Sequence, residues 1–157
     1  IKSFFKKTIL LSGCISSGRD IASAMQMGAD LAYMGTRFIN TKESKASDAY
    51  CNMIIEAGAS DIVYTAAVSG VPANFLGPSL QAMGITEEML SRKVKVDFGE
   101  ELTAQEDEAK AWATIWSAGQ GVSSIHDSPS VSNLIKNLKI EFKEAIIQQQ
   151  TLLEKYQ

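Results

Sequence analysis

The first 35 residues hold two short apolar runs of the same character, each followed by a glycine. Thr8 to Leu11 leads to Ser12-Gly13, and Leu31 to Met34 leads to Gly35. An apolar run without polar alternation predicts a strand that is buried on both faces. The segment between the runs, from Arg19, has the spacing and composition of a helix. Strand, helix and strand within about 30 residues predict a right-handed βαβ unit with parallel strands.

Glycine and proline mark the ends of the elements expected in the middle of the chain. Gly28 is placed to end the first helix. The segment 69–84 carries three glycines and two prolines, which are typical of a loop. The expected order is a helix over 46–57 that Gly58 ends, a strand over 62–65, a loop over 69–84 with at most one helical turn at 79–83, and a short helix over 86–90.

Two helix starts are expected in the last third of the chain. Thr103 with Glu106 three residues later matches a capping box, which predicts a helix that stops near Gly119. Ser128 is placed as the N-cap of the final helix, with Pro129 at its first position. The final helix carries a regular apolar stripe, so we expect it to pack against another element.

Composition excludes several classes of protein. The 157 residues are 45% hydrophobic, and 15 Lys and Arg stand against 18 Asp and Glu, without a basic stripe. We therefore expect no nucleic-acid partner. The longest apolar runs fall far short of the roughly 20 residues that cross a bilayer, so no membrane span is expected. Two cysteines are too few for a disulfide framework, which favours the cytoplasm.

The two glycine ends suggest a place for an anion. Parallel strands bring Gly13 and Gly35 to the same edge of the sheet, where the amides of Cys14, Ile15 and Thr36 can point at a ligand. The positive N-terminal end of the first helix is expected to help. The alternative is that both glycines only serve tight turns, and the spacing leaves the two interpretations equal.

Five stretches carry a family resemblance. They are Leu11 to Asp20, Ala24 to Asp30, Met34 to Phe38, Trp116 to Gln120 and Asp127 to Val131. In this order and spacing they resemble the nitronate monooxygenase family, formerly called 2-nitropropane dioxygenases, over essentially the whole chain. The resemblance implies an FMN-dependent enzyme that oxidises alkyl nitronates with O2. It also implies an α/β fold, the C-terminal part of a (β/α)8 TIM barrel with additional helices.

The resemblance also assigns parts of the chain. It implies that residues 1–40 hold barrel strands 7 and 8 with the FMN-phosphate loops, that 41–102 form a helical and loop segment on the substrate side, and that 103–157 form the C-terminal helices. The family usually has two glycines where this chain has Gly13-Cys14. The implied FMN contacts are Gly13, Cys14, Ile15, Gly35 and Thr36 at the phosphate, with Ser117, Gly119 and Gln120 on a loop that returns towards the flavin.

The resemblance places the catalytic base upstream of Gly13. A barrel needs about 250 residues, so we expect the chain to be a fragment of one larger enzyme that lacks the N-terminal barrel half, with no catalytic residue of its own. His126 is interpreted as a surface residue beside the final helix start, Cys51 as a core residue, and Trp112 with Trp116 as a packed pair. The carboxylates lack histidine partners at ligand spacing, so no metal is expected.

Other functions remain open from the sequence. A flavin-dependent enoyl-acyl carrier protein reductase resembles the same glycine motifs but would use NAD(P)H. A non-catalytic phosphate-binding module of a lipid or polyketide multienzyme is the alternative from another class. The expected partners are a small-molecule substrate and O2, and an oligomer is compatible with the sequence. The native substrate is not readable, because most of its pocket would lie upstream.

Overall fold

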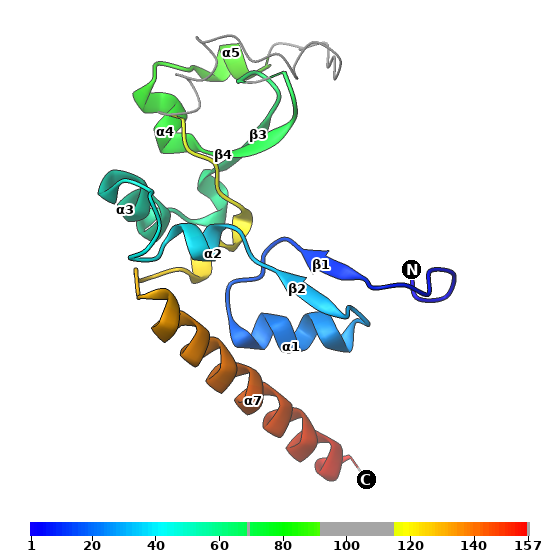
Figure 1. The fold of residues 1–157 in the computed structure, drawn as a ribbon. Helices are drawn as coiled ribbons and strands as arrows, with labels where there is room; N and C mark the ends of the chain where they lie inside the picture. The colour runs from blue at the N-terminus through cyan, green and yellow to red at the C-terminus, as the bar shows by residue number, and fades with distance from the viewer. Residues whose placement is uncertain (69, 92–114, 157) are drawn as a thin grey trace.

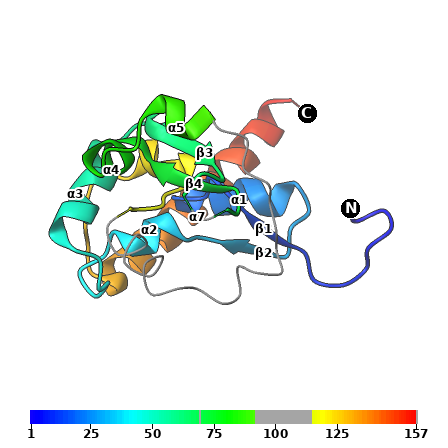
Figure 2. The same ribbon diagram turned by 90° about the horizontal axis from the view of Figure 1, so that it is seen from above.

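The fold begins with the expected βαβ unit. The computed structural model describes residues 1–68, 70–91 and 115–156. Strand β1 (Leu10–Ser12) and strand β2 (Leu31–Tyr33) are parallel and pair from Leu10 with Leu31 to Ser12 with Tyr33. Helix α1 (Gly18–Gln26) connects them, and the two strands lie side by side (Figures 1 and 2). The α/β class and the parallel pairing are therefore confirmed.

Local capping explains the bounds of α1. The Ser17 side chain accepts from the Asp20 amide, and the Asp20 carboxylate accepts from the Ser17 amide at 2.9 Å, which makes a capping box. At the other end, Met27 is the C-cap and Gly28 follows with a φ of +94°. Gly28 therefore ends the helix as predicted, because a left-handed residue there favours glycine.

The expected burial of the strands on both faces is wrong for this chain. Leu10 and Leu31 are 51% and 52% exposed. Among the described residues, β1 and β2 form a two-stranded sheet with no further neighbour. Apolar strand side chains become buried only when other strands and helices cover them, and here α1 provides the covering contact.

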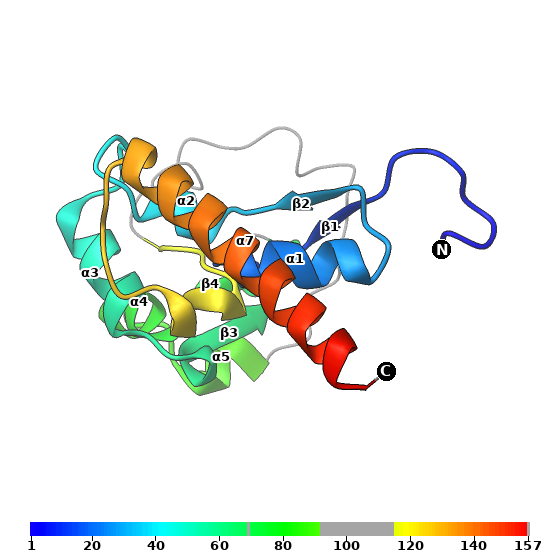
Figure 3. The same ribbon diagram turned by 90° about the horizontal axis from the view of Figure 1, so that it is seen from below.

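Helix α7 (Val131–Lys155) packs against α1 on the side away from the sheet (Figures 1 and 3). Its N-cap is Ser130, whose side chain accepts from the Asn133 amide, so the expected N-cap at Ser128 and first position at Pro129 are wrong. Among the described residues, Ser128 Oγ is buried and has no hydrogen-bond partner. The Pro129 carbonyl accepts from the Lys42 amide at 3.0 Å, which fixes Pro129 before the helix starts.

The middle of the chain forms a second small sheet beside the βαβ unit. Strand β3 (Ile62–Thr65) confirms the third predicted strand and pairs antiparallel with β4 (Ala73–Leu76) (Figure 1). The helices around it are α2 (Thr36–Ile39), α3 (Asp48–Glu56), α4 (Gly77–Ala82) and α5 (Glu87–Ser91), with short 3-10 turns η1 (Ala59–Asp61) and η2 (Gln120–Ser124).

The expected loop over 69–84 is wrong at β4, for which no strand was predicted, and α4 is longer than the single helical turn expected at 79–83. Phe75 and Leu76 are fully buried in β4, and burial of these side chains outweighs the flanking glycines. Pro78 lies in the first turn of α4, where a missing N–H costs no helix hydrogen bond. Gly58 does not end α3 as a left-handed cap, since Ala57 is an extended C-cap and Gly58 has a φ of −100°.

The helix expected from Thr103 to near Gly119 lies largely outside the described residues. Its described part, 115–119, is not helical. Ser117 bridges Phe75, and the Trp116 carbonyl accepts from the Leu76 amide at 2.8 Å, so this segment continues the β3–β4 sheet. Trp116 stacks on Tyr50, and the pairing with Trp112 falls outside the described residues.

Two buried clusters hold this second region together. One is centred on Ile54, Leu76 and Val122, and the other on Phe75 and Leu80. Leu76 and Phe75 are neighbours in β4 and point to opposite sides of the strand, so β4 joins the two clusters. No helix among the described residues combines the length and hydropathy that crossing a bilayer requires.

Candidate functional site

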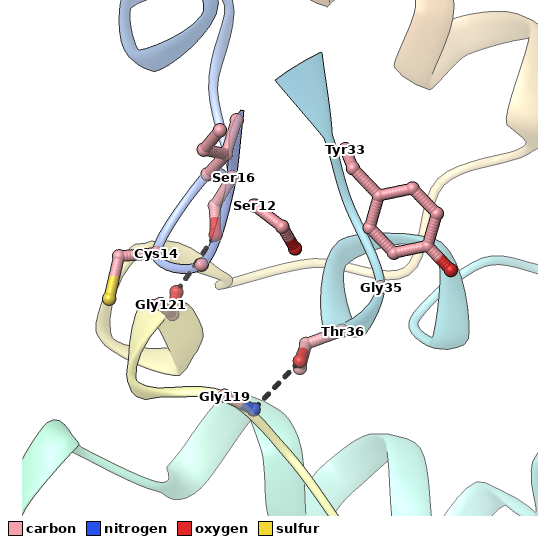
Figure 4. Close-up of a pocket in the computed structure, with 10 residues that line it drawn as sticks. Ser12, Cys14, Ser16, Tyr33, Gly35, Thr36, Gly119 and Gly121 are labelled. Atoms are coloured by element: carbon pink, nitrogen blue, oxygen red, sulfur yellow. Dashed lines mark hydrogen bonds between the residues drawn. The ribbon is translucent and has the colours of Figure 1, made fainter. Parts of the chain in front are cut away.

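A pocket of about 180 Å³ lies where β1 and β2 end (Figure 4). Three segments that are far apart in the chain form its walls: the loop after β1, the loop after β2, and the segment before and within η2. The lining residues are Ser12, Gly13, Cys14, Ile15, Ser16, Tyr33, Gly35, Thr36, Gly119 and Gly121.

The loop after β1 turns through two left-handed residues. Gly13 has a φ of +102° and Cys14 a φ of +55°. A Cβ at Gly13 would meet no atom within 4 Å, so its face is open to the pocket. Within the part of the chain that the structure describes, the amides of Cys14 and Ile15 have no hydrogen-bond acceptor. Two neighbouring amides of this kind are donors for a small anion.

Gly35 opens the pocket from the β2 side. Its φ is −102°, which any residue adopts, so backbone strain does not explain a glycine here. A Cβ at Gly35 would meet nothing within 4 Å. The sequence left open whether the two glycines serve tight turns or leave space for a ligand. Gly13 does both, whereas Gly35 only leaves space in the pocket.

The third wall is tied to the other two by hydrogen bonds. The Gly119 amide donates to Thr36 Oγ1 at 2.9 Å, and Ser16 Oγ donates to the Gly121 carbonyl at 3.0 Å (Figure 4). A Cβ at Gly121 would lie 2.7 Å from Ser16 Oγ and 3.2 Å from Cys14 Cα. Only glycine allows this close contact between η2 and the loop after β1.

The N-terminal end of α1 is already occupied by carboxylates. Asp20 Oδ2 accepts from the amides of Ser16 and Ser17 at 3.0 and 2.9 Å, and Glu141 Oε2 accepts from the Gly18 amide at 2.6 Å. The expected help from this helix end is therefore wrong, because its free donors and its positive end already face two acidic side chains. An anion in the pocket would depend on the loop amides.

The pocket lining is uncharged where the structure describes it. None of the described lining residues has an acidic or a basic side chain. Thr36 Oγ1 accepts from Gly119, which leaves the hydroxyl hydrogen of Thr36 to donate to a ligand. The Ser12 side chain lies between the two strand ends, while the Cys14 sulfur points away from Thr36 (Figure 4). This donor set suits an anion that brings its own charge.

Six of the eight residues proposed from the sequence line this pocket, and two do not. Ser117 is exposed, and its carbonyl accepts from the Tyr50 hydroxyl while its backbone bridges Phe75. Gln120 is exposed at the start of η2. The lining residues that sequence reasoning missed are Ser12, Ser16, Tyr33 and Gly121. The Gly-Gln-Gly spacing over 119–121 is the signal that could have identified Gly121 as a lining residue.

The histidine, the two cysteines and the possible metal ligands were also considered from the sequence. His126 is exposed and does not line the pocket. Cys14 is an exposed free thiol, and Cys51 is half-buried, with its Sγ donating to the Ile39 carbonyl at 3.8 Å. The described residues contain no group of His, Cys, Asp and Glu that could hold a metal ion.

Comparison with known sequences identifies one family. The family model described as nitronate monooxygenase matches residues 8–141. A nitronate monooxygenase of Paraburkholderia phytofirmans is 29% identical over 148 residues, which cover 89% of this chain and 39% of that protein. A probable nitronate monooxygenase of Staphylococcus saprophyticus is 35% identical over 65 residues, 41% of this chain and 18% of that protein. The chain thus spans well under half of these relatives.

Solved structures show the same fold in longer chains. A mutant of FabK from Thermotoga maritima matches with a TM-score of 0.71 and 28% identity, over 94% of this chain and 46% of that chain. Nitroalkane oxidase from Streptomyces ansochromogenes matches with a TM-score of 0.74 and 23% identity, over 94% and 43%. The family match extends from β1 to α7 and includes every segment of the pocket. The chain belongs to the nitronate monooxygenase family.

Proposed function

We propose that this chain supplies the flavin-phosphate half of an FMN-dependent enzyme that oxidises alkyl nitronates with O2. The observation that carries the proposal is the pocket at the ends of β1 and β2. Among the described residues it combines two amides without a hydrogen-bond acceptor, two glycines with open faces, and lining side chains without a carboxylate. Family membership supports a flavoprotein oxidoreductase, and the pocket supports a phosphate at this place.

The residues present fit the phosphate of FMN. The amides of Cys14 and Ile15 and the hydroxyl of Thr36 would donate to phosphate oxygens. No acidic side chain among the described lining residues opposes a dianion. Gly13 and Gly35 would allow the phosphate to lie against the backbone, because neither presents a Cβ to the pocket.

The remaining FMN contacts proposed from the sequence are Gly119 on the third wall and two residues that do not line the pocket. Gly119 would hold Thr36 in place through its amide, while Ser117 and Gln120 would contact FMN beyond its phosphate. FMN supplies the electron-transfer chemistry, and the protein binds and orients it. No residue of this chain is proposed as the base that acts on the substrate.

The rest of the enzyme is proposed to complete a (β/α)8 barrel. In that arrangement β1 and β2 would be strands 7 and 8, and the half-exposed Leu10 and Leu31 would be covered by neighbouring elements. The base histidine, most of the substrate pocket and the access of O2 would belong to the N-terminal half. We also propose the three-part division at residues 40 and 102, and a cytoplasmic enzyme.

The experiment is to purify the complete protein, release its flavin and identify it by chromatography, and to measure O2 consumption with ethyl nitronate or propionate 3-nitronate. We expect FMN and O2 uptake that depends on nitronate. FAD, a colourless protein, or NADH oxidation with a crotonyl thioester in place of nitronate turnover would overturn the proposal, the last in favour of the reductase. The 157-residue chain alone is expected to show no turnover.

A further inference from the structure

Tyr50 in α3 makes two contacts with the segment that leads into the third wall of the pocket. Its hydroxyl donates to the Ser117 carbonyl. Its ring stacks on Trp116, with 5.1 Å between ring centroids and 13° between ring planes. Tyr50 does not itself line the pocket. Its sequence position on the apolar face of the helix expected over 46–57 indicated only a packing role.

The segment that Tyr50 contacts is fixed on its other side by the second sheet. The Trp116 amide donates to Ser79 Oγ at 3.1 Å, and the Trp116 carbonyl accepts from the Leu76 amide at 2.8 Å. These bonds hold Trp116, and the Ser117 backbone bridges Phe75 of the same sheet. The next carbonyl, that of Ser117, is held by Tyr50.

Two residues later the same segment reaches the pocket. The Gly119 amide donates to Thr36 Oγ1 at 2.9 Å. That bond occupies an acceptor site of the Thr36 hydroxyl, so the hydroxyl hydrogen is left for another acceptor. The position of Gly119 therefore decides how Thr36 can donate into the pocket.

We propose that Tyr50 is a positioning residue for the anion site: its hydroxyl holds residues 117–119 so that Gly119 orients the Thr36 hydroxyl towards the ligand phosphate. The inference rests on the proposed function of the pocket as a phosphate site. It goes beyond it by assigning a role to a side chain on a different helix, outside the pocket lining and outside the family motifs quoted above.

Burial supports the choice of a phenol at this place. Burial raises the pKa of Tyr50 above its ordinary value of 10.0, despite the opposing effect of its hydrogen bond with Ser117. The hydroxyl therefore stays neutral and remains a donor at physiological pH. Phenylalanine would keep the stack on Trp116 and remove only this donor.

The test compares Tyr50→Phe with a matched control, Tyr64→Phe, both made in the complete protein. Tyr64 lies on β3, is 70% exposed and does not line the pocket. Two quantities are measured: the hydrogen-exchange rate of the Gly119 amide, and the ratio of the dissociation constants for riboflavin and FMN. Riboflavin lacks the phosphate, so the ratio isolates phosphate binding from binding of the ring.

We expect Tyr50→Phe to speed exchange at Gly119 and to lower the riboflavin-to-FMN ratio by about threefold to tenfold, the effect of one lost hydrogen bond. The Ala22 amide in α1 should keep its exchange rate, and Tyr64→Phe should change neither quantity. In a Thr36→Val background, Tyr50→Phe should leave the ratio unchanged, because the path from Gly119 to the ligand is already removed.

The outcomes separate the two proposals. A wild-type chain that binds riboflavin as tightly as FMN would contradict the phosphate site itself. A wild-type preference for FMN that Tyr50→Phe retains would contradict the role of Tyr50 and leave the phosphate site standing. Equal losses of affinity for FMN and riboflavin, or an additive effect in the Thr36→Val background, would also overturn the role of Tyr50. Either result would indicate a general effect on folding.

Discussion

The Gly119 amide and Thr36 Oγ1, 83 positions apart in the chain, are joined by a 2.9 Å hydrogen bond. The bond connects the residue that follows the β2 glycine to the segment that enters η2. Ser16 and Gly121 make the corresponding connection to the loop after β1. Three separate stretches of family resemblance therefore meet at one pocket. The pocket forms only when the fold brings these distant segments together.

Gly35→Asp should remove FMN from the complete protein and leave the fold intact. The φ of −102° suits any residue, and a Cβ meets nothing within 4 Å, so the substitution is tolerated by the backbone. The new carboxylate would stand beside a dianion, and a like-charge contact costs several kcal/mol where solvent is excluded. Flavin absorbance after purification gives the occupancy, and circular dichroism checks the fold.

Gly35→Asn is the matched control, since asparagine has nearly the same shape without the charge. We expect Gly35→Asn to retain more flavin than Gly35→Asp. Wild-type flavin occupancy in Gly35→Asp would contradict the proposed position of Gly35 beside the FMN phosphate.

Gly18→Ala should destabilise the contact between α1 and α7. A Cβ at Gly18 would lie 2.1 Å from the Leu138 carbonyl oxygen and 2.5 Å from the Phe142 nitrogen, both backbone atoms that cannot turn aside. We expect a loss of about 3 kcal/mol in the free energy of unfolding, measured with urea. Gly35→Ala, at an open position, should change it by less than about 0.5 kcal/mol. Equal stability of the two variants would contradict the close packing.

The sequence predicts the parts of the fold that are local. The βαβ unit follows from two apolar runs, and the end of α1 follows from Gly28, because both depend on neighbouring residues. The start of α7 and the presence of β4 were not predictable in this way. Ser130 is the cap in place of Ser128, and the start of α7 contacts Lys42 and Glu43. Phe75 is buried in a cluster with Leu80 and Ile115.

The same distinction applies to the site. Gly13 and Gly35 were predicted because strand ends meet at one edge of a parallel sheet. Gly121 was missed, because its contact with Ser16 and Cys14 depends on how η2 packs across more than 100 residues. Tyr50 was missed for the same reason, since its partner Ser117 lies 67 positions away.

Asp127→Ala should cost more stability than Arg37→Met, although both remove the same ion pair. Arg37 Nη2 lies 2.6 Å from Asp127 Oδ1, and the side chains are 8% and 60% exposed, respectively. Removing Asp127 leaves a buried guanidinium without its counter-charge, which costs about 3 kcal/mol. Removing Arg37 leaves a carboxylate that water already reaches, so we expect a loss of about 1 kcal/mol. Urea unfolding gives both values, and the reverse order would contradict this account.

Tyr50 should make stability fall at alkaline pH. Its pKa is raised in the folded protein, chiefly by burial, so the fold favours the neutral phenol. This contribution is fully present below the unfolded pKa of about 10 and is lost as the pH rises through the folded pKa. Between about pH 9 and about pH 11, the wild-type free energy of unfolding should fall more steeply than that of Tyr50→Phe. Parallel curves would show that Tyr50 ionises without cost in the fold.

The most direct test of the phosphate site is an amide nitrogen–proton NMR titration of the complete protein, stripped of its flavin, with FMN and, in parallel, with riboflavin. We predict that FMN shifts the amide signals of Cys14, Ile15 and Thr36 with a single dissociation constant, and that riboflavin leaves them in place at the same concentrations. Equal shifts with both flavins, or FMN-induced shifts that avoid these three amides, would contradict the claim that this pocket holds the flavin phosphate.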